Sequence, residues 1–206
     1  MMKHEYKKHE KNIYVPTSEP TITDIPAYQY LTITGLGNPN SEEFRAKISA
    51  LYSLSYAIKM SPKNGHLISG YYEYTVYPLE GIWDLTEEGK AKNLLDKNEL
   101  VYKIMIRQPD FVTEDVFKNI LQKLVEKKNI PFLSDIKFEV IQDGNSIQIM
   151  HIGSFDDEPK SFLKMKDYLE KHNLKQRSLV HREIYLSNFQ KTKPEDLKTV
   201  LRYFIE

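Results

Sequence analysis

Apolar and polar residues alternate with a period of two in several short stretches of the chain, a pattern typical of half-buried β-strands. The clearest stretch is AYQYLTITG, residues 27–35, which is also rich in aromatic and β-branched side chains. Tyr72, Tyr74 and Val76 alternate in the same way. On this basis the predicted strands are residues 27–35, 71–76, 100–107, 179–186 and 199–204.

Apolar residues at helical spacing occur between these strands in three places. Ser41 is a favourable N-cap for a helix that ends before Pro62, and Thr113 is one for a helix that runs to about residue 128. A third helix is expected over about residues 158–172. Helix and strand patterns therefore alternate along the chain, which predicts an α+β fold.

Two turns are predicted between the strands. Residues 78–83 are expected to turn the chain. The sequence Asp143-Gly144-Asn145 lies between two alternating runs, residues 136–141 and 146–152, and this arrangement predicts a β-hairpin.

A weak internal repeat appears in the order of these elements. A strand, a glycine turn, a helix and a strand follow one another from residues 31–35 onward and again from residues 148–153 onward. Two βαββ halves would pack as a pseudo-twofold pair with a cleft between them, and such clefts often bind ligands. We therefore expect residues 1–20 to be a loosely ordered lead-in and residues 21–206 to form a single domain, with halves of about 21–110 and 111–206.

Composition narrows the class of protein. Lys plus Arg and Asp plus Glu both number 29, so the net charge is zero and a basic nucleic-acid-binding surface is not indicated. The chain has no cysteine, which excludes disulfides and thiolate chemistry. No apolar run approaches the roughly 18 residues that span a bilayer, and the charged N-terminus is unlike a signal peptide. We expect a cytoplasmic protein without nucleic-acid or membrane partners; the oligomeric state stays open.

The strand at residues 179–186 carries the strongest candidate site. His181, Glu183 and Tyr185 share one face of it, because successive strand side chains alternate. If Glu183 is buried, desolvation raises its pKa and it can act as a general base or bind a cation. The alternative is that Glu183 is a solvated residue on an exposed sheet face, and spacing alone leaves the two interpretations equal.

Aromatic residues supply further candidates. The chain has 14 tyrosines and a single tryptophan, Trp83. Trp83 either fills the core or forms a pocket wall that stacks on a flat or cationic ligand. His151, alone on its strand, is typically structural. No residues stand at metal-ligand spacing and no nucleotide-binding glycine motif is present, so neither a metal nor a cofactor is expected.

Five segments together resemble the GyrI-like small-molecule-binding family. The resemblance covers roughly residues 51–203. The segments are PLEGIWD (78–84), MIRQPDFVT (105–113), IQIMHIGSFDDEP (147–159), HREIYLSN (181–188) and LKTVLRY (197–203).

This resemblance implies two fused βαββ (SHS2) modules with pseudo-twofold symmetry around a central ligand cleft. It also implies that Glu183 matches the acidic residue of the pocket. We expect Tyr185, which lies beside Glu183 on the same strand face, to be a second catalytic residue. Tyr102 matches an aromatic position of the family. The ligand-binding residues that we expect are Trp83, Tyr72, Tyr74, Tyr102, Met105, His151, Phe155 and Tyr56.

The branch that these segments resemble contains cyclopropanoid cyclopropyl hydrolases, which detoxify DNA-alkylating compounds by adding water to a cyclopropane. Two positions depart from that branch: Asp84 stands where a second tryptophan is usual, and residues 188–191 differ from the usual loop. Two alternatives remain: a non-catalytic protein that sequesters hydrophobic or cationic drugs through Glu183, and a protein that interacts with DNA gyrase.

Overall fold

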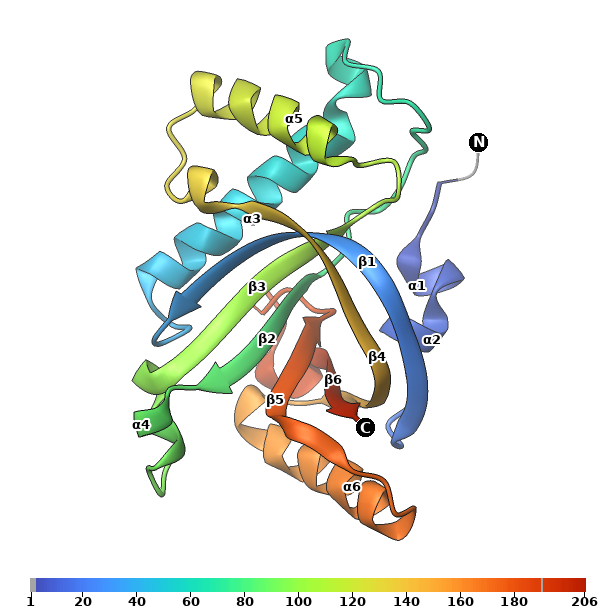
Figure 1. Ribbon diagram of the computed structural model, residues 1–206, viewed down its shortest axis with the longest axis vertical. Helices are drawn as coiled ribbons and strands as arrows, with labels where there is room; N and C mark the ends of the chain where they lie inside the picture. Colours follow the sequence, from blue (N-terminus) through green and yellow to red (C-terminus); the bar gives the residue numbers. More distant parts are fainter. Residues whose placement is uncertain (1–2, 190) are drawn as a thin grey trace. The chain divides into compact units, whose positions relative to one another are not determined.

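The computed structural model describes residues 3–189 and 191–206 (Figure 1). Gln190, within the loop that departs from the family pattern, lies outside the described residues. The strands are β1 (Thr21–Leu36), β2 (Leu79–Leu85), β3 (Leu100–Gln108), β4 (Lys137–Ile152), β5 (Gln176–Tyr185) and β6 (Lys198–Ile205).

Helices alternate with these strands, as the α+β prediction requires. The α-helices are α1 (Tyr6–His9), α2 (Lys11–Tyr14), α3 (Glu42–Met60), α4 (Glu87–Lys90), α5 (Glu114–Lys127) and α6 (Glu158–Lys171). Short 3-10 turns cover Pro62–Asn64, Lys97–Glu99, Leu133–Asp135, Phe155–Asp157 and Pro194–Asp196. Among the described residues, no helix combines the length and the apolar character that crossing a membrane requires.

The strands form a closed barrel in the hydrogen-bonded order β1-β3-β2-β5-β6-β4. The chain divides into two compact units. Unit 1 comprises Met1–Glu5, Tyr28–Leu79 and Leu85–Ile141, and unit 2 comprises Tyr6–Ala27, Glu80–Asp84 and Gln142–Glu206.

In unit 1, β1 and β3 pair antiparallel, with Gln29 opposite Gln108 at one end and Leu36 opposite Val101 at the other. Helix α3 packs against α5 and β3 (Figure 1). The predicted N-cap of α3 is confirmed, because the Ser41 hydroxyl accepts a hydrogen bond from the Phe44 amide at 3.1 Å. Thr113 caps α5 in the same way.

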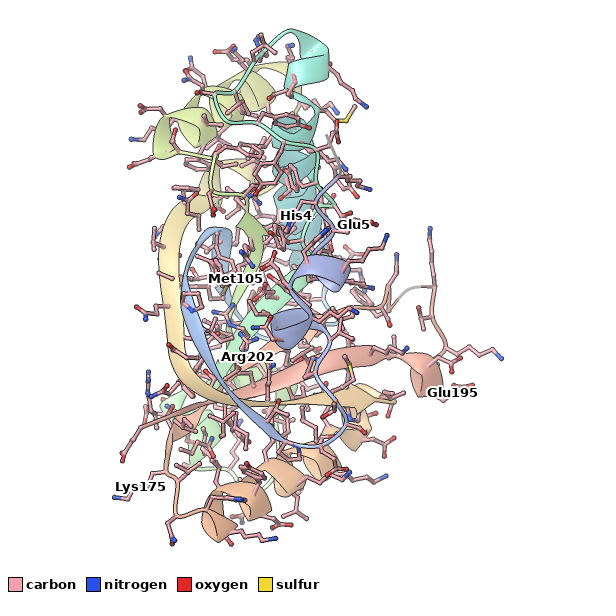
Figure 2. All side chains as sticks on the ribbon, turned by 90° about the vertical axis from the view of Figure 1, so that its right-hand side faces the viewer. His4, Glu5, Met105, Lys175, Glu195 and Arg202 are labelled. Atoms are coloured by element: carbon pink, nitrogen blue, oxygen red, sulfur yellow. The ribbon has the colours of Figure 1, made fainter. Side chains whose placement is uncertain are left out.

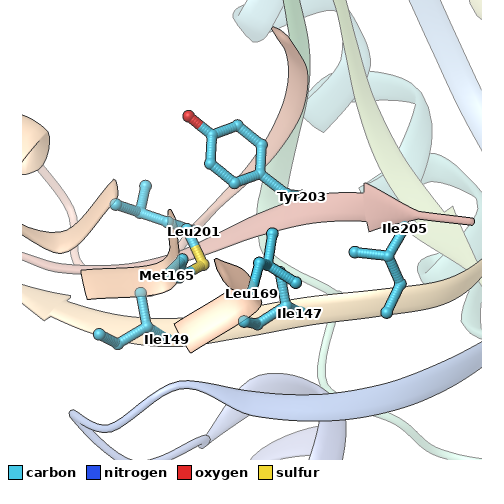
Figure 3. Close-up of a cluster of buried hydrophobic side chains, with 7 residues drawn as sticks. All are labelled: Ile147, Ile149, Met165, Leu169, Leu201, Tyr203 and Ile205. Atoms are coloured by element: carbon cyan, nitrogen blue, oxygen red, sulfur yellow. The ribbon is translucent and has the colours of Figure 1, made fainter. Parts of the chain in front are cut away.

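In unit 2, β6 lies between β4 and β5 and pairs antiparallel with both. The register gives two faces, because successive side chains of a strand alternate. One face packs against α6 through a cluster of buried apolar side chains (Figure 3). The cluster consists of Ile147, Ile149, Met165, Leu169, Leu201, Tyr203 and Ile205. His181 pairs with Tyr203, and Glu183 pairs with Leu201, so the side chains of His181 and Glu183 both belong to this face.

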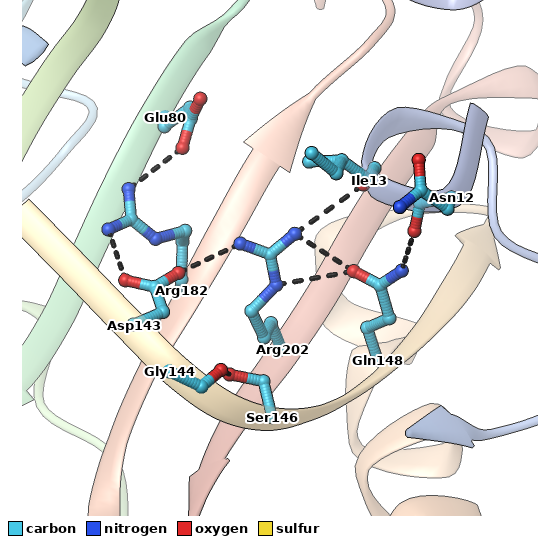
Figure 4. Close-up of polar contacts among 9 residues, drawn as sticks. All are labelled: Asn12, Ile13, Glu80, Asp143, Gly144, Ser146, Gln148, Arg182 and Arg202. Carbon is cyan, nitrogen blue, oxygen red and sulfur yellow. Dashed lines mark hydrogen bonds and ion pairs between the residues drawn. The ribbon is translucent and has the colours of Figure 1, made fainter. Parts of the chain in front are cut away.

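The opposite face of the same strands also holds buried charged side chains (Figure 4). Arg182 pairs with Arg202 across β5 and β6, and Gln148 pairs with Arg202 across β4 and β6. Asp143 accepts hydrogen bonds from Arg182 at 2.6 Å and from Arg202 at 2.8 Å. Glu80 of β2 accepts a second bond from Arg182 at 2.8 Å.

This network explains why the predicted hairpin at residues 143–145 is wrong. The chain runs through them without turning back, as one long strand, β4. Asp143 is 3% exposed and held by two guanidinium groups, so it does not occupy a solvated turn. Gly144 has a φ of 66°, a conformation that glycine adopts readily, and it accommodates an irregularity within the strand.

Two neighbouring predictions are also wrong. Residues 71–76 form no strand; only Tyr74 makes an isolated bridge, to His4. Their alternation instead reflects ring packing, because Tyr72 and Tyr74 both contact Phe111 edge-on. Residues 78–83 were expected to turn, but β2 begins at Leu79.

The N-terminal residues of unit 2 make specific contacts. Ile13 and Tyr14 of α2 are buried, and the carbonyl oxygen of Ile13 accepts a hydrogen bond from Arg202. Gln148 donates to the carbonyl of Asn12 at 2.5 Å. Figure 2 shows the described side chains together: Met105 is enclosed, whereas Lys175 and Glu195 project outward.

Candidate functional site

The site is built from the α6-facing side of β5, from Gly81 and Trp83 of β2 and from the start of α6, and all of these residues belong to unit 2. His181, Glu183 and Tyr185 lie on one face of β5, as their spacing predicts, and they contact one another through Glu183. Glu183 is 9% exposed. The interpretation of Glu183 as a solvated surface residue is therefore wrong.

A chain of hydrogen bonds leads to Glu183 from the only tryptophan. Trp83 Nε1 donates to the Tyr185 hydroxyl at 2.8 Å, and that hydroxyl donates to Glu183 Oε2 at 2.7 Å. Trp83 is 5% exposed. The indole lies directly over Gly81, where an added Cβ would be 2.7 Å from Trp83 Nε1. Glycine at this position therefore allows the indole to reach Tyr185.

The second carboxylate oxygen of Glu183 faces His181. His181 Nε2 lies 3.1 Å from Glu183 Oε1, and His181 Nδ1 lies 3.3 Å from the carbonyl oxygen of Leu179. Phe162 of α6 packs edge-on against the imidazole with ring centroids 4.9 Å apart. Both oxygens of Glu183 thus have a hydrogen-bonding partner that fixes the orientation of the carboxylate.

Glu158, the first residue of α6, supplies a second carboxyl group to this site. It is 7% exposed, and its Oε1 atom has no hydrogen-bond partner among the described residues. Burial raises the pKa of Glu158 to about 10, with further contributions from the charges of Glu183 and Asp156. Glu158 therefore carries its proton at neutral pH.

Tyr185 also keeps its proton. Burial raises the pKa of Tyr185 well above its ordinary value, and the charge of Glu183 and their hydrogen bond add to this effect. The hydroxyl uses its hydrogen on Glu183 and accepts a hydrogen from Trp83. Tyr185 is therefore arranged to hold the Glu183 carboxyl in place.

Two other predicted residues, Phe155 and His151, also belong to unit 2. Phe155 is 39% exposed and meets the Tyr185 ring edge-on at a centroid distance of 6.0 Å. His151 is buried and contacts both α6 and the segment before it: its Nε2 is 2.9 Å from the carbonyl of Ser154, and its Nδ1 is 3.0 Å from the hydroxyl of Ser161 in α6. The structural interpretation of His151 agrees with these contacts.

The remaining predicted ligand-binding residues all belong to unit 1: they are Tyr56, Tyr72, Tyr74, Tyr102 and Met105. Tyr72 and Tyr74 both contact Phe111. Tyr56 is exposed, and its ring lies beside that of Tyr52.

Tyr102 and Met105 are both buried within unit 1. Phe44 packs edge-on against the Tyr102 ring, and the Lys47 amine donates to its hydroxyl at 3.4 Å. Tyr102 lies against Gly35, where an added Cβ would be 2.3 Å from its hydroxyl oxygen.

Glu158 was not among the predicted site residues, because an acidic residue at the start of a helix is an ordinary sequence feature. Acidic residues are common in the first turn of a helix, where they favour the helix dipole and are usually solvated. Only the packing of α6 against β5 and β6 buries this one. No group of three or more His, Asp or Glu side chains in residues 3–189 and 191–206 is placed to hold a metal ion.

Comparison with solved structures shows close relatives of full length. A hydrolase encoded by lin2189 of Listeria innocua is 33% identical, with a TM-score of 0.91 and coverage of 100% of both chains. An uncharacterized conserved protein from Listeria innocua is 33% identical, with a TM-score of 0.92, and covers 99% of this chain and 100% of its own.

A more distant structure shares the fold alone. The EcmrR C-terminal domain is 11% identical, with a TM-score of 0.54 over 91% of this chain and 97% of that chain. No curated protein matches the sequence significantly. The model of the GyrI-like small molecule binding domain matches residues 18–205. The chain therefore belongs to the GyrI-like small-molecule-binding family.

Proposed function

We propose that this protein is a hydrolase that adds water to strained, electrophilic small molecules, with cyclopropane-bearing DNA-alkylating compounds as the substrate class. The carrying observation is the Glu158 carboxyl: it is buried, it keeps its proton, and one oxygen has no partner among the described residues. Glu183 beside it is held by two hydrogen bonds. Two carboxyls in different protonation states are what general acid–base catalysis of hydration requires.

In this proposal Glu183 removes a proton from a water molecule as the water oxygen attacks a cyclopropane carbon. The carbon–carbon bond of the ring breaks, and its electron pair passes into the ligand, which becomes a phenolate. Glu158 then donates its proton to the phenolate oxygen. Each group contributes typically about 10²- to 10⁴-fold to such a reaction. Ring strain supplies the remaining driving force.

Three further observations support the assignment. The lin2189 protein, 33% identical over the full length, is described as a hydrolase. The segments that carry Glu183 and Glu158 are among those that resemble the hydrolase branch of the family. Trp83, Tyr185 and Phe155 place aromatic surface beside the carboxyl pair, which suits a flat apolar ligand. The two-module arrangement around a central ligand cleft, the cytoplasmic location and the detoxifying role remain parts of this proposal.

Glu183→Gln and Glu158→Gln test it. Each variant keeps the side-chain shape, so both should bind a cyclopropane-bearing alkylator as tightly as the wild type. Formation of the water-added product, followed by mass spectrometry, should fall about 10²- to 10⁴-fold in each. Glu170→Gln, an exposed change on α6, is the matched control. Unchanged turnover in Glu183→Gln would refute the assignment.

The same measurements separate the alternative of a binding protein. Glu183, with its two oxygens oriented by His181 and Tyr185, is also suited to pair with a cationic hydrophobic ligand. In that case the wild type binds the compound without releasing a water-added product, and Glu183→Gln loses affinity for cations. A gyrase supercoiling assay with the purified protein tests the remaining alternative, a gyrase-interacting protein.

A further inference from the structure

His151, near the end of β4, and Ser161, in the first turn of α6, form a contact that the proposed hydration does not use. His151 Nδ1 lies 3.0 Å from the hydroxyl oxygen of Ser161. The imidazole is shielded from solvent, because His151 is 5% exposed, whereas Ser161 is only half-buried. A hydroxyl that is hydrogen-bonded to an imidazole is the arrangement that activates serine as a nucleophile.

The contacts of the imidazole define which of its nitrogens is the base. His151 Nε2 lies 2.9 Å from the carbonyl oxygen of Ser154. A carbonyl oxygen only accepts hydrogen bonds, so Nε2 carries the hydrogen, and in the neutral ring the lone pair is on Nδ1. The Ser161 hydroxyl therefore donates its hydrogen to Nδ1, and each contact joins one donor to one acceptor. The proton of the nucleophile already faces the base that would take it.

The segment before α6 holds the orienting carbonyl in place. The Asp157 amide donates to the Ser154 carbonyl at 3.0 Å, and the Ser154 hydroxyl donates to Asp157 Oδ2 at 2.9 Å. Hydrogen bonds from Lys160 and Ser154 lower the pKa of Asp157, and the charge of His151 adds a smaller contribution. Asp157 is therefore a carboxylate whose charge favours the protonated form of His151.

Glu158 supplies a hydrogen-bond donor close to Ser161 in the same helix. Residues three apart lie on the same face of a helix, so Glu158 and Ser161 are neighbours on α6. The Glu158 carboxyl is buried and keeps its proton, and its Oε1 atom has no partner among the described residues. A neutral buried carboxyl can donate a hydrogen bond to an oxyanion. The start of α6 and the end of β4 thus provide a nucleophile, a base and an oxyanion donor.

We propose that Ser161 is the nucleophile of a second catalytic centre that hydrolyses aryl esters of carboxylic acids, with His151 as its base. This inference goes beyond the proposed hydration and does not require Glu183. Ser161 Oγ attacks the ester carbonyl carbon while its proton passes to His151 Nδ1. The carbon–oxygen bond to the aryl group then breaks, and the phenolate leaves with the proton from Nδ1.

Water completes the cycle on the acyl-serine. Its oxygen attacks the carbonyl carbon and gives one proton to His151 Nδ1. The bond between the carbonyl carbon and Ser161 Oγ breaks, the carboxylic acid leaves, and Nδ1 returns its proton to Ser161. The sum is one ester and one water converted into one acid and one phenol, with both side chains restored.

The groups around the imidazole favour aryl esters over amides. His151 Nε2 is bonded to a neutral carbonyl, and the Asp157 carboxylate is engaged by Ser154 and Lys160. The imidazolium is therefore stabilised less than it is by a directly bonded carboxylate, as in the triad of serine proteases. Such a base suits a leaving group that departs readily as an anion. A phenolate meets this requirement, and the anion of an amine does not.

An acylation experiment with p-nitrophenyl acetate tests the assignment. The wild type is mixed with excess ester, quenched in acid and digested, and mass spectrometry should find an acetyl group on Ser161 together with an initial burst of p-nitrophenolate. Ser161→Ala should lose both, and His151→Gln should slow acetylation about 10²- to 10⁴-fold. Ser134→Ala, at an exposed serine, is the matched control. Acetyl groups on lysine alone, or a burst that persists in Ser161→Ala, would overturn the proposal.

The absence of cysteine from the chain provides a second readout that is independent of ester turnover. In Ser161→Cys the introduced thiol is the only one, and His151 should favour its thiolate form. Alkylation by iodoacetamide at neutral pH should be about tenfold faster than in Ser134→Cys, and adding His151→Gln should remove this advantage. Equal rates with and without His151 would contradict the pairing. If the wild type acetylates Ser161 but releases no water-added product from a cyclopropane-bearing alkylator, this inference stands and the proposed hydration is refuted.

Discussion

The Tyr185 hydroxyl donates its hydrogen to Glu183 Oε2 at 2.7 Å, from a position two residues further along the same face of β5. Because Trp83 Nε1 donates to the same hydroxyl at 2.8 Å, the acceptor capacity of Tyr185 is also engaged. Sequence spacing suggested Tyr185 as a catalytic residue. Its contacts indicate that it orients the carboxylate on which catalysis depends.

A double-mutant cycle tests this relationship. Tyr185→Phe should lower turnover about tenfold with little change in substrate affinity, because Glu183 loses one of its two orienting bonds. Trp83→Phe should have a smaller effect through the same hydroxyl. The double variant should lose less than the product of the two single effects, since both act on one chain of contacts. Multiplicative losses would show that Trp83 and Tyr185 act independently.

Gly81→Ala should disturb the site from beneath the indole. The added methyl group would lie 2.7 Å from Trp83 Nε1 and 3.4 Å from the Tyr185 hydroxyl, so the indole must move. Trp83 is the only tryptophan, and intrinsic fluorescence therefore reports on this ring alone. We expect a shift in its emission maximum together with a loss of turnover. An unchanged spectrum would show that the indole does not rest on Gly81.

The protonated state of Glu158 should appear in the pH dependence of stability. Its pKa is raised from 4.5 to about 10 in the folded protein, chiefly by burial. The folded state therefore binds one more proton than the unfolded state between these values. The raised pKa of Glu158 therefore adds to the free energy of unfolding. This stabilisation is fully present below about pH 4.5, and it is lost as the pH rises toward 10, at up to about 1.4 kcal/mol per pH unit.

Urea unfolding of the wild type and of Glu158→Gln at pH 6, 7, 8 and 9 measures this contribution. Glutamine resembles the protonated carboxyl and does not titrate, so the variant should show a flatter profile and become the more stable of the two as the pH rises. Glu170→Gln should follow the wild type, because Glu170 is exposed on the same helix. Parallel profiles for the wild type and Glu158→Gln would contradict the protonated state.

The buried charge network beneath the site should be costly to break (Figure 4). Burial alone would raise the pKa of Asp143, but Arg182 and Arg202 hold it below its ordinary value. Asp143→Asn removes the charge that compensates two guanidinium groups that are at most 1% exposed. We expect a loss of about 3–5 kcal/mol in the free energy of unfolding. Asp167→Asn, on the exposed side of α6, should change it by less than about 0.5 kcal/mol.

Several elements could be predicted from the sequence because their signals are local. The helices that begin after Ser41 and Thr113 follow from an N-cap and an apolar period, and β6 follows from a short β-rich run. The shared face of His181, Glu183 and Tyr185 follows from strand alternation. Local signals failed where long-range contacts competed: residues 143–145 resemble a turn, but Arg182 and Arg202 draw Asp143 into the interior.

The sequence by itself determined the family, the α+β class and Glu183 as the central polar residue, because these depend on motifs and on the period of a single strand. Only the tertiary structure decided the protonation of the site. Glu158 stands in an ordinary helical first turn, and it becomes a proton-bearing acid because α6 packs it against β5 beside Glu183. Desolvation and proximity between distant segments set that pKa, and neither is encoded in the spacing of neighbouring residues.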